Sequence, residues 1–167
     1  MSDDAYRFRE YSGGCQCGAV RFHATELHDN PHICYCRMCQ KAMGSFFAPL
    51  VGVRHDHLTW TRGEPAVFMS SEHIARGFCS DCGTPLFYQN LEGQFVSLTI
   101  GSFDEPHLIP IRFQCGLEGR HPDFSELTAG QIEGTTEGDN DAGWVEGIRA
   151  TNHQHPDHDT ASWPPAE

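Results

Sequence analysis

Eight cysteines, seven of them in three short clusters, limit what this 167-residue chain can fold into more than any other feature. Two clusters are pairs, a Cys-x-Cys at residues 15–17 and a Cys-x-x-Cys at residues 79–82, and the third holds three cysteines within residues 34–39. Short clusters that converge from distant segments are typical of tetrahedral zinc sites. Disulfide bonds are the alternative, but they are typical of exported proteins, and residues 1–10 are charged and polar, unlike a signal peptide. The sequence therefore favours metal binding.

The charge pattern narrows the classes of partner. The net formal charge is −12 at pH 7, and the Lys and Arg residues are scattered, whereas phosphate binding requires them to be clustered. We therefore expect no nucleic acid as a partner. No apolar run approaches the roughly 20 residues that cross a bilayer, so we expect no membrane association and a cytoplasmic protein.

Residues 1–127 are predicted to form one mostly β domain. Apolar residues alternate over short segments, and Gly and Pro stand at nearly every junction, as in small antiparallel sheets. The only helix expected in this domain is a short one after Cys39, through residues 40–43. The expected strands are residues 20–23, 45–53, 58–60, 66–69, 74–78, 84–88, 95–100 and 111–115.

Residues 128–167 are predicted to form an irregular acidic tail, partly disordered or wrapped on the domain. Residues 133–167 contain eight acidic residues and one basic residue, a charge of −7. High charge with few apolar residues disfavours a core of its own. Within the tail, residues 144–148 can form an amphipathic turn that docks on the domain, and the histidine-rich residues 152–159 are a candidate for metal binding or for a lid.

Four of the clustered cysteines are predicted to form a closed structural site. A Cys-x-Cys pair and a Cys-x-x-Cys pair each supply two thiolates, and neighbouring glycines such as Gly18 and Gly83 let the backbone bend around a metal. A zinc ion with four cysteine ligands does no chemistry and stabilises the fold. The predicted ligands are Cys15, Cys17, Cys79 and Cys82.

The remaining cluster, Cys34, Cys36 and Cys39, can hold one face of a second zinc ion. In one interpretation the fourth position is open to water, a thiol or another substrate, as in catalytic zinc sites. In the other the site is closed, with Cys115 or a histidine as the fourth ligand. The spacing of the cysteines does not distinguish the two, and both give two zinc ions per chain.

The three motifs together resemble those of a known family. Residues 13–22 read Gly-Gly-Cys-Gln-Cys-Gly-Ala-Val-Arg-Phe, residues 34–39 carry Cys-x-Cys-x-x-Cys, and residues 77–86 read Gly-Phe-Cys-x-x-Cys-Gly-Thr-Pro-Leu. In this order they closely resemble the glutathione-dependent formaldehyde-activating enzyme family, to which centromere protein V also belongs. The resemblance covers residues 11–110 and includes Gly-Ser-Phe-Asp at residues 101–104, similar to the family's Gly-Ser-Leu-Asp turn.

The resemblance implies a β-tent fold of small antiparallel sheets. It also implies a structural zinc on the first four cysteines and a catalytic zinc on the other three. The implied activity is that of a carbon–sulfur lyase: glutathione and formaldehyde combine to S-hydroxymethylglutathione, or the adduct is split, with the thiol bound at the open zinc. After Pro110 the chain departs from the pattern of many family members, which continue with a His-Ile pair and a Trp-containing segment. The wall that this segment contributes is therefore expected to differ.

Several residues are candidates for roles beside the second cluster. Arg37 and Lys41 flank it and are candidate contacts for the carboxylates of glutathione, although solvated surface charges would have the same pattern. Phe46 and Phe47 are candidates for the lining of a pocket. A proton carrier is expected among the histidines, because imidazole titrates near neutral pH. The candidate histidines are His32, His55, His57 and His73.

Two functions of other classes stay open at the level of the sequence. One is a non-catalytic zinc module that binds a protein partner and has two closed sites. The other is a redox-sensing zinc–thiolate switch, in which mild oxidation releases the metal of the second cluster. An accessible zinc that exchanges a thiol ligand favours the enzyme over both.

Overall fold

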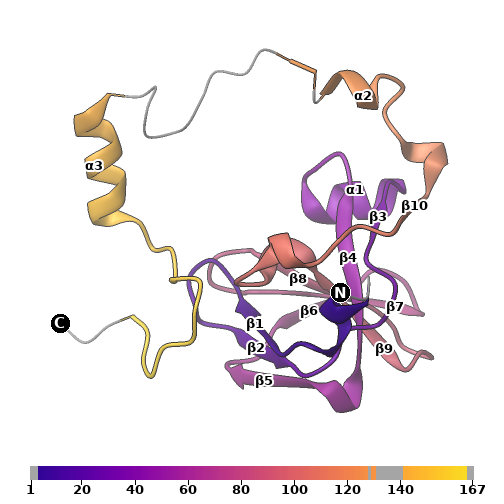
Figure 1. The fold of residues 1–167 in the computed structure, drawn as a ribbon, viewed down its shortest axis with the longest axis horizontal. Coiled ribbons are helices and arrows are strands. Elements are labelled where there is room, and N and C mark those ends of the chain that lie inside the picture. The colour runs from indigo at the N-terminus through magenta and orange to yellow at the C-terminus, as the bar shows by residue number, and fades with distance from the viewer. Residues whose placement is uncertain (1–3, 128, 131–140, 165–167) are drawn as a thin grey trace.

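The structure, a computed structural model, describes residues 4–127, 129–130 and 141–164. These residues are mostly β, with ten strands in two sheets and short helices between them (Figure 1). The strands are β1 (Tyr11–Gly14), β2 (Arg21–Ala24), β3 (His32–Cys34), β4 (Ala48–Arg54), β5 (Leu58–Arg62), β6 (Ala66–Met69), β7 (Ile74–Phe78), β8 (Pro85–Asn90), β9 (Phe95–Thr99) and β10 (Phe113–Cys115). The α-helices are α1 (Arg37–Met43), α2 (Phe124–Leu127) and α3 (Ala142–Thr151). Short 3₁₀ turns are η1 (Ala5–Phe8), η2 (His55–His57), η3 (Ile100–Ser102), η4 (Pro106–Leu108) and η5 (Leu117–Gly119).

The two sheets differ in size and share one core. The smaller has the order β1-β2-β5, and the larger has the order β10-β3-β4-β9-β8-β7-β6. All pairs are antiparallel except β10 with β3, which is parallel. Phe22 of the small sheet and Val51 and Leu98 of the large sheet are fully buried in one cluster. Val51 and Leu98 are also direct partners across β4 and β9, so apolar side chains of neighbouring strands hold the register.

Most strands lie where the alternation of apolar residues predicted them, and the bounds of β6 and β7 match the prediction to the residue. Sequence reasoning missed β1 and β3. β1 has four residues, two of them glycine, and β3 has three residues, so neither carries enough side chains to show a period of two.

The helix of the second cysteine cluster begins earlier than predicted. α1 starts at Arg37 with Cys36 as its N-cap, and it ends at Met43 with Gly44 as its C-cap, which has a left-handed φ of 60°. Cys39 therefore lies inside the helix and does not precede it. Residues three apart on a helix lie on the same side, so the Cys-x-x-Cys spacing is met by a helical turn.

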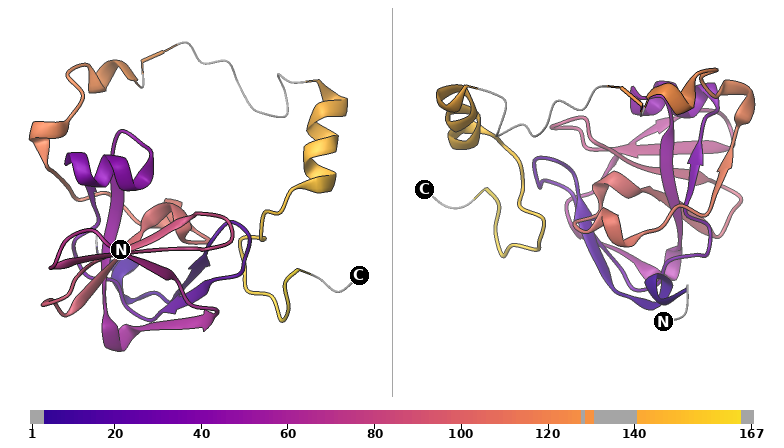
Figure 2. Two further views of the ribbon diagram at one scale, coloured as in Figure 1. Left: turned by 180° about the vertical axis from the view of Figure 1, so that it is seen from behind. Right: turned by 45° about the horizontal axis from the view of Figure 1, so that its top comes forward.

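The end of the tail lies against the connection between β1 and β2, as the yellow segment in Figure 2 shows. The backbone N–H of His155 donates to the carbonyl of Gln16 at 2.7 Å, and buried Arg21 donates to Asp159 at 2.8 Å. His155 is itself buried, with the ring of Trp163 at 5.0 Å. The histidine-rich segment therefore contacts the first cysteine motif.

The amphipathic segment of the tail forms a longer element than predicted and does not dock. It is α3, ten residues long, none of which is buried. Trp144 and Ile148 are 56% and 46% exposed. Residues 131–140, in the predicted acidic stretch, lie outside the described residues. In the part of the chain that the structure describes, no helix has the length and apolar character needed to cross a membrane.

Candidate metal centres

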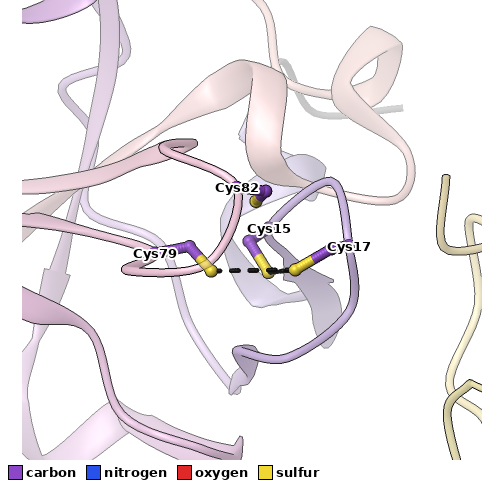
Figure 3. A group of neighbouring side chains, drawn as sticks. All are labelled: Cys15, Cys17, Cys79 and Cys82. Carbon is purple, nitrogen blue, oxygen red and sulfur yellow. Dashed lines mark hydrogen bonds between the residues drawn. The ribbon is translucent and has the colours of Figure 1, made fainter. Parts of the chain in front are cut away.

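Four cysteine sulfurs from two distant turns meet in the first cluster, Cys15, Cys17, Cys79 and Cys82 (Figure 3). All four sulfurs lie within 4.8 Å of one another. The Sγ atoms of Cys15 and Cys17 are 3.6 Å apart, and those of Cys17 and Cys79 are 3.8 Å apart. Zinc–sulfur bonds of about 2.3 Å in a tetrahedron place neighbouring sulfurs about 3.8 Å apart. The spacing of the sulfurs fits one zinc ion.

The two turns that present these sulfurs have the same hydrogen-bond pattern. In each, a glycine N–H donates to the carbonyl of the first cysteine: Gly18 to Cys15 at 3.1 Å, and Gly83 to Cys79 at 2.9 Å. The φ angles of the two glycines are 74° and 77°, a left-handed conformation that strains any other residue. A Cβ at Gly18 would also meet the His155 ring at 2.3 Å. The glycines therefore let each cysteine pair turn back on itself as a two-thiolate clamp.

The first cluster is continuous with the main core. Cys15 and Cys79 are 3% and 1% exposed. Burial raises the pKa of the Cys17 thiol to about 12. Burial acts on Cys82 in the same direction, but hydrogen bonds from Thr84 outweigh it and lower the pKa of Cys82 to about 6. A zinc ion bound here would replace the proton of a thiol such as Cys17.

The second cluster comprises Cys34, Cys36 and Cys39, whose sulfurs also lie within 4.8 Å of one another. Cys34 ends β3, Cys36 caps α1, and Cys39 lies in the first turn of that helix. Burial raises the pKa of Cys34 to about 11 and that of Cys39 to about 12, the latter against a hydrogen bond from Arg76. Burial also opposes ionisation of Cys36, but the backbone N–H of Cys39 and the neighbouring thiols outweigh it, and the pKa of Cys36 falls below its usual value.

A cavity of about 290 Å³ opens beside the second cluster. Its walls are largely apolar, with one cation, Arg76. Apart from the three cysteines, the lining residues are His32, Met38, Leu50, Ile74, Arg76, Tyr88, Ser97 and Cys115. Across the described ranges of the chain, no fourth Cys, His, Asp or Glu joins this group of three sulfurs.

Cys115 lies close to the second cluster without joining it. In the parallel pairing of β10 with β3, Cys115 is the direct partner of Cys34, so both side chains are on one face of the sheet. Cys115 packs against the cluster and lines the same cavity. Its sulfur is outside the group of sulfurs within 4.8 Å. The parallel strand β10 thus gives the cavity a fourth thiol, separate from the three of the second cluster.

The two positively charged candidates, Arg37 and Lys41, lie at the rim of the cavity beside the second cluster. Arg37 is exposed and donates to Gln40 at 3.1 Å, and Lys41 is exposed one turn further along α1. Both line a shallow hollow of about 410 Å³ that also includes Met38 and Arg76. Because Met38 and Arg76 line the cavity as well, the two spaces are neighbours.

Of the four candidate histidines, His32 alone lines the cavity. Its Nδ1 lies 2.7 Å from the carbonyl of Asn30, and its ring stacks on Phe113 at 4.9 Å. The other three occur on η2 or beside exposed acids, away from the cysteines. His57 lies 3.4 Å from Glu26, and His73 lies 3.4 Å from Glu92.

Neither of the two candidate phenylalanines lines the cavity. Phe46 is 52% exposed, with its ring 5.8 Å from that of His121. Phe47 packs on Tyr35 and Phe124.

Sequence reasoning missed Arg76, a charged residue that contacts the second cluster. Its Nη2 donates to the sulfur of Cys39 at 3.5 Å, although the two residues are 37 positions apart. The signal available was a single arginine in the otherwise uncharged strand of residues 74–78. It could not be interpreted before the sheet order placed β7 beside α1.

The fold and the two clusters define the class: a mostly β protein with two cysteine clusters that can hold metal. This chain belongs to the glutathione-dependent formaldehyde-activating enzyme family, whose model matches residues 10–115. A Halomonas elongata protein assigned the same family name is 30% identical in an alignment 128 residues long that covers 69% of this chain and 79% of that protein. A crystal structure of a Rhodobacter sphaeroides protein is similar in fold, with a TM-score of 0.51 at 20% identity, covering 62% of this chain and 99% of the other.

The affinity of the second cluster for zinc is expected to fall steeply as the pH falls. Zinc binds thiolates, and Cys34 and Cys39, with pKa values of about 11 and about 12, each release a proton when metal binds near neutral pH. Two released protons lower the affinity about a hundredfold for each unit of pH. Competition with a chromophoric chelator between about pH 6.5 and 8.5 measures this slope, and Cys36→Ser isolates the first cluster as a control. An affinity independent of pH would contradict the prediction.

Proposed function

We propose that this protein is a zinc-dependent enzyme of the carbon–sulfur lyase type. Its substrates would be adducts of glutathione, or of another thiol, with formaldehyde or a similar small aldehyde. The observation that supports this most is the meeting of three cysteine sulfurs at a cavity, with no fourth donor from the described residues in their group. Four protein ligands leave no position for a substrate, whereas three leave one. The family to which the chain belongs supplies the thiol and the aldehyde as the substrates to test.

The donor sets fit zinc, two ions per chain. Sets of three and four thiolates favour zinc over the harder divalent cations, which prefer oxygen ligands. The first cluster, continuous with the core, would hold a structural zinc. A zinc ion in the second cluster would lower the pKa of a ligand thiol, so that the thiol is ionised at neutral pH.

The residues around the second cluster suit a thiol that carries carboxylates. Arg37 and Lys41 stand at the rim, where they can hold the carboxylates of glutathione while its thiol enters the cavity. The apolar walls formed by Leu50, Ile74 and Tyr88 exclude water from the reacting carbon. The wall from β10, which departs from the family pattern, would shape the preference for one aldehyde over another. Eight free thiols fit the reducing cytoplasm.

Native mass spectrometry with and without excess glutathione tests the proposal. We expect two zinc ions per chain, and we expect glutathione to add to the complex, because the second cluster leaves one position for a thiol. S-methylglutathione is the matched control ligand, since it has the same carboxylates and no ionisable thiol. An assay of adduct formation and cleavage with formaldehyde then measures the reaction.

Other outcomes would identify a different function. Two zinc ions that glutathione neither joins nor displaces would indicate closed sites and favour a module that binds a protein partner. Binding of glutathione without any exchange of formaldehyde would show a thiol carrier and contradict the lyase.

A further inference from the structure

A buried arginine with an unused donor stands beside the second cluster. Arg76 is 7% exposed. Its Nη2 donates to Cys39 Sγ at 3.5 Å, and its Nε donates to Ser70 Oγ at 3.3 Å. Its Nη1 is also buried and has no hydrogen-bond partner. Because an unsatisfied buried donor destabilises the fold, this nitrogen points to a group that the chain itself does not supply.

The electrostatic surroundings of Arg76 match an anionic ligand. No carboxylate among the described residues pairs with it, and its side-chain hydrogen bonds go to Cys39 Sγ and Ser70 Oγ. Its other close neighbour is the ring of Tyr88, 5.1 Å from the guanidinium carbon. A buried guanidinium is stable only with compensating negative charge, which an anionic ligand in the cavity would supply.

The backbone of Arg76 is held between two strands, and the residue lines the cavity. It lies in the middle of β7, paired with Phe68 on β6 and with Tyr88 on β8. It lines both the cavity of the three cysteines and the neighbouring hollow. A donor held by strands on both sides is already in place before a substrate arrives, which is the property that makes oxyanion stabilisation effective.

We propose that Arg76 forms an oxyanion-binding site, in which the free Nη1 binds the oxygen of the aldehyde adduct while Nη2 holds Cys39. This role of Arg76 rests on the proposed function. It adds the group that stabilises the negative charge formed on the oxygen during the reaction. The sulfur of the ligand thiolate attacks the aldehyde carbon, a C–S bond forms, and the C–O π pair moves to oxygen. Arg76 donates a hydrogen bond to that alkoxide and keeps its own proton. The proton that the thiol lost returns to the oxygen through solvent, so the S-hydroxymethyl product contains every atom of the two reactants.

Arg76→Met and Arg76→Lys test the site in zinc-loaded protein. For Arg76→Met we expect kcat for adduct formation to fall about a hundredfold or more, with the zinc content and the affinity for glutathione retained. Lysine keeps the charge but cannot span Cys39 and a substrate oxygen as a planar fork does, so kcat is expected to stay low in Arg76→Lys. Full activity in Arg76→Lys would mean that Arg76 acts only through its positive charge, and it would overturn the proposal.

Formate is a probe of the same site that needs no turnover. It is a one-carbon anion, and we expect it to bind the wild type and to lose about tenfold or more in affinity in Arg76→Met, as measured by line broadening of its NMR signal. Arg54→Met is the matched control, because Arg54 is 47% exposed, pairs with Asp56 and does not line the cavity. Unchanged formate affinity in Arg76→Met would overturn the proposal. Formate binding that depends on Arg76, in a wild type inactive on glutathione and formaldehyde, would support the anion site and contradict the proposed reaction.

Discussion

Replacing Cys82 by serine is expected to remove one zinc ion and to destabilise the whole domain. The first cluster joins the turn after β1 to the turn after β7, and two of its cysteines are buried in the main core. A structural zinc contributes about 10 kcal/mol or more of folding free energy in small domains, which is comparable to the entire stability of a typical protein. We expect the melting temperature of Cys82→Ser to fall by roughly 10 °C or more, measured by circular dichroism.

Ser80→Ala is a suitable control for this loss. It changes the same turn, and Ser80 is exposed, with its hydroxyl donating a hydrogen bond to its neighbour Asp81 at 3.1 Å. Its zinc content and melting temperature should equal those of the wild type. A Cys82→Ser protein that keeps its melting temperature after losing zinc would show that the first cluster is not structural.

Replacing Cys36 by serine is expected to abolish the second zinc ion and all activity while leaving the domain folded. The second cluster belongs to a small hydrophobic cluster that is separate from the main core and includes Ala48 and Leu50. Cys36 is only half-buried. Cys36 is also the N-cap of α1, a position that serine favours, so the start of the helix is kept. We expect the free energy of unfolding to change by no more than about 1 kcal/mol.

Zinc analysis, circular dichroism and the formaldehyde adduct assay on the same preparation check this result. Cys115→Ser is the matched control, because Cys115 lines the same cavity but lies outside the group of three sulfurs. It should keep two zinc ions. If Cys36→Ser and Cys82→Ser unfold the domain equally, the division into a structural and an open site is wrong.

The local features of this protein can be predicted from its sequence. The cysteine motifs, and the glycines that turn the chain beside them, depend on a few neighbouring residues. Gly18 and Gly83 occupy left-handed conformations that could be expected from their place after Cys17 and Cys82. Strands β6 and β7 follow from two short segments rich in apolar residues and from the polar turn between them. The grouping of the cysteines as four plus three is also the grouping in which the structure brings their sulfurs together.

Tertiary structure alone decided what surrounds the second cluster. Cys115 reaches the cavity because β10 runs parallel to β3, a pairing that local propensities do not encode. Arg76 meets Cys39 because the order of the seven-stranded sheet brings β7 near α1. His155 lies over the first motif, away from the second. The physical reason is the same in each case: local spacing governs turns and single strands, whereas the neighbours of a site are set by contacts between residues far apart in the chain, whose free energy depends on the whole sheet.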